Sequence, residues 1–409
     1  MTHMPPPTIS PPLPAHLPRH AVTGRADRFH AATRIATGQL LEHVRAASPA
    51  LLTYALLRIV GVSTLAVFAA LANRDVLSLL GKYDGIWYVG IANRGYDAAI
   101  PVATDGALQT TNLAFFPLYP ALIAFFDNVL PGGPRAAGLV IGWSAGLAAA
   151  WGLFALGRHL RDRRTGVLLA AVWAVLPHSI VQSMVYTETL LTALAVWSLY
   201  CVLRERWLTA GVLCLFAGLV RPTAAALVVA VGLAAGVAVW QGRSRWRAAA
   251  AAVLAPLGLV AYVAWVGWRL GRPDGYFYLQ DAAWGTSFDG GAFTLAKLYE
   301  VLIKAQPLQF YAVTGVLALA ILLAFLAAAQ RVPWPLLVYA AVMIVMVIGA
   351  AGYYHAKARL LMPAFPLLLP IVAGLVAARA HTRVAVLSAL TLVSAWYGVY
   401  LCLVWGYSP

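Results

Sequence analysis

The stretch PLQFYAVTGVLALAILLAFLAA, residues 307–328, contains no charged side chain. About 20 predominantly apolar residues in a helix are enough to cross the ~30 Å hydrocarbon core of a bilayer. Inside that core each backbone N–H and C=O must be bonded within the protein, a condition that a helix meets by itself. We therefore predict that residues 307–328 form a membrane-spanning helix.

The composition of the whole chain points the same way. Apolar residues make up 62% of the 409 residues and charged residues only 11%, against roughly 25% in a typical soluble protein. The net charge of +15 does not indicate nucleic-acid binding, because the basic residues are distributed between apolar segments instead of gathering on one face. All three cysteines, Cys201, Cys214 and Cys402, lie inside apolar segments, so neither a disulfide framework nor a C-x-x-C metal site is indicated.

Eleven apolar segments of this kind follow one another along the chain. They cover approximately residues 50–72, 136–157, 166–184, 187–203, 207–220, 223–240, 248–270, 307–328, 333–352, 359–378 and 383–405. The predicted fold is an all-α polytopic membrane protein with about eleven transmembrane helices, extracytoplasmic loops at 73–135 and 271–306, and interfacial helices. Residues 1–48 are polar and Pro-rich, and we predict a disordered or amphipathic cytoplasmic tail there and a single transmembrane domain over 49–409.

The distribution of positive charge predicts the topology. With an inside N-terminus and eleven spans, 17 of the 29 Lys and Arg residues lie on the inner side, as the positive-inside rule requires. The further apolar stretch 113–130 contains Pro117 and Pro120, and counting it as a span would move the Arg158–Arg164 cluster to the wrong side. We therefore expect it to lie in the outer interface. The protein is predicted to be a multi-pass plasma-membrane protein with a cytoplasmic N-terminus and an extracytoplasmic C-terminus and active site.

The first outer loop contains the most informative motifs. It reads Lys82-Tyr83-Asp84-Gly85-Ile86-Trp87-Tyr88, then Ile91-Ala92-Asn93-Arg94-Gly95-Tyr96-Asp97, and later Phe115-Phe116-Pro117-Leu118-Tyr119-Pro120. A carboxylate in an apolar, partly dry setting binds protons more tightly, which suits a general base. From the residues alone, Asp84 is either such a base or a solvated loop acid.

The pattern D-G-x-W-Y-x-x-I-A-x-x-G-Y followed by F-F-P-L-Y-P resembles the PIG-V family of GPI mannosyltransferases and its bacterial relatives. The likeness extends to Tyr186-Thr187-Glu188 and to Arg359-Leu360-x-x-Pro363-x-x-Pro366, and so covers most of the chain from about residue 50 onward. One departure is Tyr83, where many relatives have Trp. The resemblance implies a GT-C-type glycosyltransferase that uses a polyprenyl-phosphate sugar as donor, with Asp84 as the general base and inversion at the anomeric carbon. Asp97, the next acid, is the rival for that role.

Several cations are candidates for binding the donor phosphate. Arg221 follows a short apolar segment and is expected to lie below the outer membrane surface. An unpaired charge at that depth is costly, so a charged residue there is a functional candidate by default. Glu188 at the outer membrane edge either pairs with Arg221 or caps the helix that follows it. His355, Lys357 and Arg359 form a second basic cluster on the outer side, and either bind phosphate or anchor the chain to lipid headgroups.

The substrate contacts expected from these segments complete the predicted site. Candidates for substrate binding are Lys82, Trp87, Tyr88, Asp97, Tyr186, Glu188 and, in the second outer loop, Trp284. The acids and histidines form no recognisable metal-binding motif, so no metal site is predicted, although ligands from separate loops can converge on a divalent cation.

The predicted function is transfer of mannose from polyprenyl-phosphate-mannose to a glycolipid or another membrane-associated acceptor. The alternative is a transporter or flippase of a lipid-linked sugar. Because polar groups gather at the outer edge and the span interiors are mostly Ala, Leu and Val, the sequence favours the enzyme.

Overall fold

A computed structural model of the chain describes residues 20–409, with side chains from Glu42 onward. The part of the predicted tail that precedes His20 lies outside the described residues. Contacts divide the chain into one unit that ends at Ser48 and a second unit, Pro49–Pro409. The features that position the candidate site all belong to the second unit.

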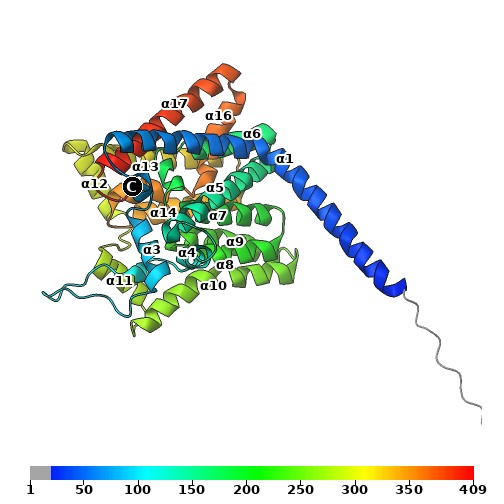
Figure 1. The fold of residues 1–409 in the computed structure, drawn as a ribbon, viewed down its shortest axis with the longest axis horizontal. Coiled ribbons are helices and arrows are strands. Elements are labelled where there is room, and N and C mark those ends of the chain that lie inside the picture. The colour runs from blue at the N-terminus through cyan, green and yellow to red at the C-terminus, as the bar shows by residue number, and fades with distance from the viewer. Residues whose placement is uncertain (1–19) are drawn as a thin grey trace, which may run out of the picture. The chain divides into compact units, whose positions relative to one another are not determined.

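Residues 20–409 are almost entirely helical (Figure 1). In chain order the α-helices are α1 (His20–Leu71), α2 (Val76–Leu80), α3 (Asp84–Arg94), α4 (Leu118–Asp127), α5 (Gly133–Leu160), α6 (Arg163–Ala174), α7 (Glu188–Leu203), α8 (Trp207–Gly218), α9 (Ala225–Trp240), α10 (Arg245–Arg269), α11 (Gly275–Trp284), α12 (Ala292–Ile303), α13 (Leu308–Ala329), α14 (Trp334–Gly349), α15 (Lys357–Leu360), α16 (Leu369–Ala377) and α17 (Ala380–Val399). Within this described part no β-strand forms, and the only β-type pairing is two isolated bridges. The predicted all-α fold class is confirmed.

The membrane-spanning character is also confirmed, but not the number of spans. Six helices in the described part are long and apolar enough to cross a bilayer: Glu42–Leu71, Gly133–Leu160, Pro222–Trp240, Arg245–Arg269, Leu308–Ala329 and Ala380–Val404. A bent pair, Tyr354–Leu360 and Phe365–Ala377, makes a seventh if the two are one broken span. The other predicted spans correspond to the shorter helices α6, α7, α8 and α14. The chain is a multi-pass membrane protein, and the count of eleven stays a prediction.

Small residues allow the helices to pack closely. Helices α8, α9 and α10 lie side by side (Figure 1), and Gly258 on α10 faces the backbone of α8. A Cβ atom at Gly258 would lie only 1.9 Å from the carbonyl oxygen of Leu215. Small residues at such crossings are typical of helix pairs in membranes, where close backbone approach increases the van der Waals contact between the helices.

Three interruptions separate successive helices and bring polar residues to their ends. They fall between α6 and α7, between α8 and α9, and between α14 and α16, and each contains a proline: Pro177, Pro222 and Pro363. Proline lacks the N–H that would continue a helix. Non-helical backbone at membrane depth is tolerated where it is buried in protein or lines a cavity. These interruptions contain, or directly adjoin, the polar residues Tyr186, Glu188, Arg221 and Arg359.

The two predicted outer loops are partly helical. The first contains α2, α3 and the ten-residue α4, which is shorter than a membrane span. The second contains α11 and α12, and backbone bonds fix it against the end of α14. Asp289 N–H donates to Gly349 O at 3.0 Å, and Ala351 N–H donates to Ser287 O at 2.7 Å.

Candidate functional site

Asp84 is the first residue of α3 and lies at the centre of the candidate site. The preceding residue, Tyr83, has φ 56° and ψ −117°, a conformation that is costly for a non-glycine residue and is found preferentially at functional sites. Gly85 lets α3 begin close to Val185, since a Cβ here would lie 3.1 Å from Val185 Cβ and 3.2 Å from its carbonyl oxygen. The close approach of Val185 therefore explains why the motif has a glycine after Asp84.

Four charged side chains from separate segments form a continuous group, which we call the ionic cluster. Arg359 Nη1 donates to Asp84 Oδ2 at 2.8 Å, and Arg359 Nε lies 3.4 Å from Glu188 Oε1. Arg221 Nη1 donates to the same Glu188 oxygen at 2.6 Å. Of the two roles considered for Glu188, the structure shows pairing with Arg221. Glu188 is also the first residue of α7, so its carboxylate belongs to the first turn of that helix, where a negative charge is favourable.

The ionic cluster is mostly buried and incompletely satisfied. Side-chain exposure is 1% for Glu188, 7% for Arg359, 11% for Arg221 and 21% for Asp84. Among the described residues, neither Glu188 Oε2 nor Arg359 Nε has a hydrogen-bond partner. An unsatisfied buried polar atom typically costs about 1–3 kcal/mol. The two atoms therefore leave hydrogen-bonding capacity for a polar ligand.

Hydroxyl groups lie next to Asp84 and next to the start of α7. The Asp84 backbone N–H donates to the Tyr186 hydroxyl at 3.4 Å, and the Arg359 guanidinium lies 5.0 Å from the Tyr186 ring centroid. Ser408 Oγ donates to Asp84 Oδ1 at 3.3 Å and accepts from Arg359 Nη1 at 2.9 Å. The hydroxyl of the buried Tyr88 shares a hydrogen bond of 3.2 Å with Thr187, the residue before Glu188.

Two of the predicted phosphate ligands bind elsewhere than in the ionic cluster. The Lys357 ammonium is buried and donates to the carbonyl oxygens of Val347 and Ala350, at 2.6 and 2.5 Å, where α14 ends. A cation at a helix C-terminus is favourable because the free carbonyls there carry partial negative charge. The His355 ring lies against Trp405 and Tyr407, with centroid separations of 5.7 and 5.8 Å.

The remaining predicted residues organise the outer loops. Trp87 stacks on Phe115 at 5.6 Å between centroids and meets the edge of Trp284 at 5.3 Å, so the two outer loops share one aromatic contact. Trp284 Nε1 donates to Thr111 O at 3.1 Å. The Lys82 ammonium lies 5.2 Å from the ring centroid of Tyr83.

Asp97, the rival base, is bonded within its own loop. Its Oδ2 accepts from Thr111 Oγ1 at 2.9 Å and from the Asn112 backbone N–H at 3.0 Å. Its backbone carbonyl accepts from Arg269 Nε at 2.9 Å. These bonds stabilise the segment between α3 and α4. The structure does not bring Asp97 into the ionic cluster.

Two residues with defined polar contacts escaped the sequence analysis. Ser408 lies 324 positions from Asp84 and belongs to no recognisable motif, so no pattern pointed to it. Arg58 lies within the first apolar segment, and its guanidinium donates to Ala174 O at 2.6 Å and to Ser179 O at 2.5 Å. A charged residue inside an apolar run indicates that the charge has a specific partner in the protein. Here Arg58 binds backbone carbonyl groups that are no longer bonded within a helix where α6 ends.

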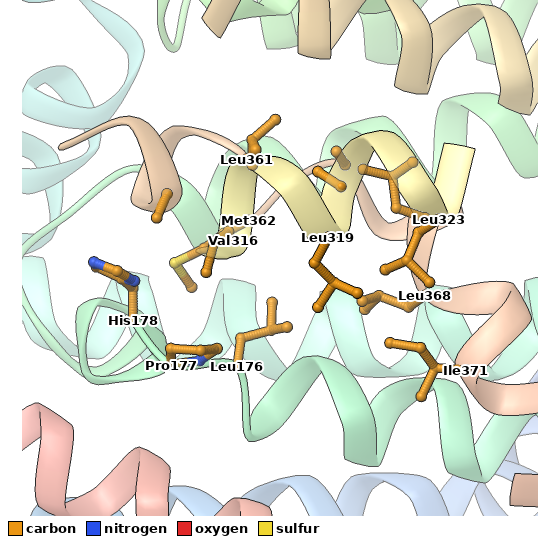
Figure 2. A pocket seen from close by; sticks show the side chains of 14 residues that line it. Leu176, Pro177, His178, Val316, Leu319, Leu323, Leu361, Met362, Leu368 and Ile371 are labelled. Carbon is orange, nitrogen blue, oxygen red and sulfur yellow. The ribbon is translucent and has the colours of Figure 1, made fainter. Parts of the chain in front are cut away.

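An apolar cavity of about 110 Å³ adjoins the segment that carries Arg359 (Figure 2). Val316, Leu319 and Leu323 of α13 line one side of it. The bent pair of helical segments and the break between them line another side, with Leu361 and Met362 in the break and Ala358 and Leu368 in the segments. Ala358 is the residue before Arg359, so the cavity begins one residue from a member of the ionic cluster.

The described residues show no metal-binding group. Nowhere between Glu42 and Pro409 do three or more His, Cys, Asp or Glu side chains gather closely enough to hold a metal ion. The two carboxylates of the ionic cluster, Asp84 and Glu188, are both paired with Arg359. In this arrangement guanidinium groups supply the positive charge opposite them.

Comparison with known proteins gives likenesses to solved structures, among them two of one archaeal enzyme. No family model and no curated protein matches the chain. The crystal structure of the Archaeoglobus fulgidus oligosaccharyltransferase in complex with Zn and sulfate is 15% identical, with a TM-score of 0.47 over 79% of this chain and 48% of that one. Its apo form is 14% identical, with a TM-score of 0.48 over 88% of this chain and 55% of that one. The chain spans about half the length of these two structures.

Proposed function

We propose that the chain is an inverting glycosyltransferase of the GT-C type, which transfers mannose from polyprenyl-phosphate-mannose to a glycolipid or another membrane-associated acceptor. The observation that carries the proposal is the ionic cluster, in which the motif acid Asp84 is held by Arg359 beside a second buried carboxylate and a second arginine. The motifs D-G-x-W-Y, Y-T-E and R-L-x-x-P, far apart in the sequence, contribute Asp84, Glu188 and Arg359 to this one place.

Asp84 is the proposed general base. Its carboxylate takes the proton from the acceptor hydroxyl while that oxygen forms a bond to the anomeric carbon of mannose. The bond from this carbon to the phosphate oxygen breaks, and polyprenyl phosphate leaves from the opposite face, so the anomeric configuration inverts. A positioned base typically contributes ~10²–10⁴-fold in rate.

Arg221 and Arg359 are the proposed ligands of the donor phosphate. Arginine binds phosphate through two parallel N–H donors, and charge-assisted bonds of this type are among the strongest in proteins. Arg359 Nε is buried, lies 3.4 Å from Glu188 Oε1 and makes no hydrogen bond among the described residues, so a phosphate oxygen that reached it would complete its hydrogen bonding. A phosphate that shares Arg359 with Asp84 weakens this ion pair and leaves the carboxylate freer to accept a proton. We leave Lys357 out of the phosphate site, because its ammonium is bound to two carbonyls.

The apolar cavity supports a lipid-linked donor. Its lining is almost wholly aliphatic, and Ala358 places one wall next to Arg359 in the chain. A prenyl chain needs apolar surroundings and its phosphate needs cations. The cavity has room for a small part of such a chain, and Arg359 follows its lining residue Ala358 in the sequence. The donor, the acceptor and the bilayer are thus the proposed partners. The proposed site is on the extracytoplasmic side of the plasma membrane, and the N-terminus is cytoplasmic.

A transfer assay tests the proposal directly. Purified protein in vesicles is incubated with polyprenyl-phosphate-mannose and with octyl mannoside, octyl glucoside or a total lipid extract, and products are identified by mass. We expect a hexose adduct on an acceptor from the wild type and none from Asp84→Asn. If the wild type forms no product but moves the lipid-linked sugar across vesicles, the flippase alternative replaces the enzyme.

A further inference from the structure

Residues 405–409, which we call the strap, lie against the candidate site. The Tyr83 hydroxyl donates to Trp405 O at 3.0 Å, next to the strained start of α3. The Trp405 ring also packs against His355, at 5.7 Å between centroids. The strap is therefore attached to both the first outer loop and the segment that precedes Arg359.

Ser408 is the strap residue that reaches the ionic cluster. Its hydroxyl oxygen lies 3.3 Å from Asp84 Oδ1, 2.9 Å from Arg359 Nη1 and 3.0 Å from the Tyr186 hydroxyl. It thus has three polar partners, although it belongs to none of the motifs of the sequence. Two of the partners, Asp84 and Arg359, are the proposed base and a proposed phosphate ligand.

A hydroxyl in this position is what the proposed reaction requires of its acceptor. A general base takes a proton from a hydroxyl whose oxygen lies about 2.6–3.2 Å away, and this distance is often longer before substrate binds. Ser408 Oγ lies 3.3 Å from the Asp84 carboxylate, at the edge of this range. An acceptor oxygen cannot occupy the same volume as Ser408 Oγ.

We infer that Asp84 Oδ1, Arg359 Nη1 and the Tyr186 hydroxyl form the subsite for the acceptor hydroxyl, and that the strap occupies this subsite through Ser408 until an acceptor displaces it. The inference rests on the proposed function and adds to it the residues that hold the acceptor. The ligand class is the alcohol group of a sugar, because the subsite offers one carboxylate acceptor together with guanidinium and phenol donors.

Kinetics on Ser408 variants in the full chain test the inference. Ser408→Ala removes the competing hydroxyl, so we expect the KM for octyl mannoside to fall about threefold to tenfold, the effect of about one net hydrogen bond. The kcat should stay within about twofold of the wild type, and the KM for polyprenyl-phosphate-mannose should not change. Ser408→Thr retains a hydroxyl and should retain the wild-type KM for octyl mannoside.

Three outcomes overturn the inference while the proposed function survives. A lower kcat with an unchanged acceptor KM would make Ser408 a residue that positions the base. Unchanged kcat and KM would place the acceptor elsewhere. A hexose on Ser408 itself, seen by mass analysis of the intact protein, would make Ser408 an acceptor instead of a competitor. If the wild type forms no glycosylated product at all, the proposed function fails, and the inference fails with it.

A labelling experiment gives a second readout that does not depend on turnover. Ser408→Cys in nanodiscs, where both membrane faces are accessible, is treated with a maleimide, with and without octyl mannoside. We expect slow labelling that accelerates when octyl mannoside is added, because the acceptor displaces the strap. Labelling at one rate in both conditions overturns the inference. The wild type, whose three cysteines are buried, is the background control.

Discussion

Two groups of buried or half-buried charges in the described part of the chain differ in their partners. In the ionic cluster the charged groups bind one another, as Asp84 and Glu188 bind Arg359. Arg58 and Lys357 instead bind backbone carbonyls where α6 and α14 end. Lys357 is as fully buried as Glu188, so burial alone does not identify a functional residue. We expect the nature of the partner to separate the two: a charge bound to carbonyls satisfies backbone groups that would otherwise stay unpaired, whereas opposed side-chain charges can pair with a charged substrate instead.

Among the variants that separate the two groups, Asp84→Asn should have the largest effect on the rate of transfer. Asparagine matches aspartate in size and still forms hydrogen bonds, but its amide cannot accept the acceptor's proton. Transfer should fall by at least the ~10²–10⁴-fold that general-base catalysis contributes. The melting temperature should fall only modestly, because Arg359 keeps Glu188 as a charged partner. The measurement is kcat for transfer, together with thermal unfolding of the detergent-purified protein.

Asp97→Asn is the matched control for Asp84→Asn. Asp97 binds Thr111 and the Asn112 backbone within its own loop, so its change should leave kcat within a few-fold of the wild type. If Asp97→Asn abolishes transfer and Asp84→Asn does not, the base is reassigned. If neither variant loses activity, Asp84 is not the base and the proposed mechanism fails.

The next largest effect is expected at Arg221. Removing it takes a cation from the proposed phosphate site, and loss of one partner of a buried charge pair typically costs ~2–5 kcal/mol. The kcat/KM for the donor should fall accordingly in Arg221→Ala, whereas Arg331→Ala, at an exposed position, should keep the wild-type value. Both values come from titration of the transfer reaction with polyprenyl-phosphate-mannose.

A double variant separates folding from donor binding at this position. Arg221→Ala leaves the Glu188 carboxylate with one fewer partner and lowers stability as well. Adding Glu188→Gln removes that charge. The double variant should therefore regain stability, but its kcat/KM for the donor should stay low. If the double variant and the wild type have the same kcat/KM for the donor, Arg221 does not bind the phosphate.

Lys357→Met tests the opposite group, and its effect should be on stability. Methionine keeps an unbranched apolar stem but loses the two bonds from the ammonium to Val347 O and Ala350 O. Hydrogen bonds to charged groups contribute about 1.5–3 kcal/mol each, so thermal unfolding should occur at a clearly lower temperature. The protein that remains folded should keep the donor KM of the wild type. A rise in that KM of tenfold or more, with unchanged stability, would return Lys357 to the phosphate site.

The smallest expected effect is at Asp289, an acid bonded to the backbone of its own loop. The N–H groups of Phe293 and Gly291 at the start of α12 hold the pKa of the Asp289 carboxyl below its usual range. A carboxyl with a lowered pKa stabilises the fold above its unfolded pKa, and this contribution is lost as the pH falls through the lower folded value.

Amide exchange at residues 291–293 measures this effect. At neutral pH, exchange should be slower in the wild type than in Asp289→Ala. The difference should hold down to about pH 4, the region of the unfolded aspartate pKa, and should shrink progressively below it. A difference that persists undiminished as the pH falls further contradicts this assignment.

Much of the fold and part of the site followed from the sequence alone. Apolar runs without charged residues predict helices that cross a bilayer. Backbone N–H and C=O groups inside the bilayer must be hydrogen-bonded within the protein, and a helix does this within a single segment. Asp84, Glu188, Arg221 and Arg359 were recognised from local signals: a motif, or a charge at the edge of an apolar run. The pairing of Glu188 with Arg221 was one of two alternatives, and the structure shows it.

Only the tertiary structure decided how these residues are joined and which candidates are satisfied elsewhere. Lys357 and Arg359 are two positions apart in the sequence and equally basic, yet one binds carbonyls of α14 and the other binds Asp84. Ser408 reaches Asp84 across 324 positions because α17 and the strap return to the start of α3. A sequence encodes charge, size and period locally. Which carbonyl is left free at a helix end, and which side chain reaches it, is set by packing between segments that are distant along the chain.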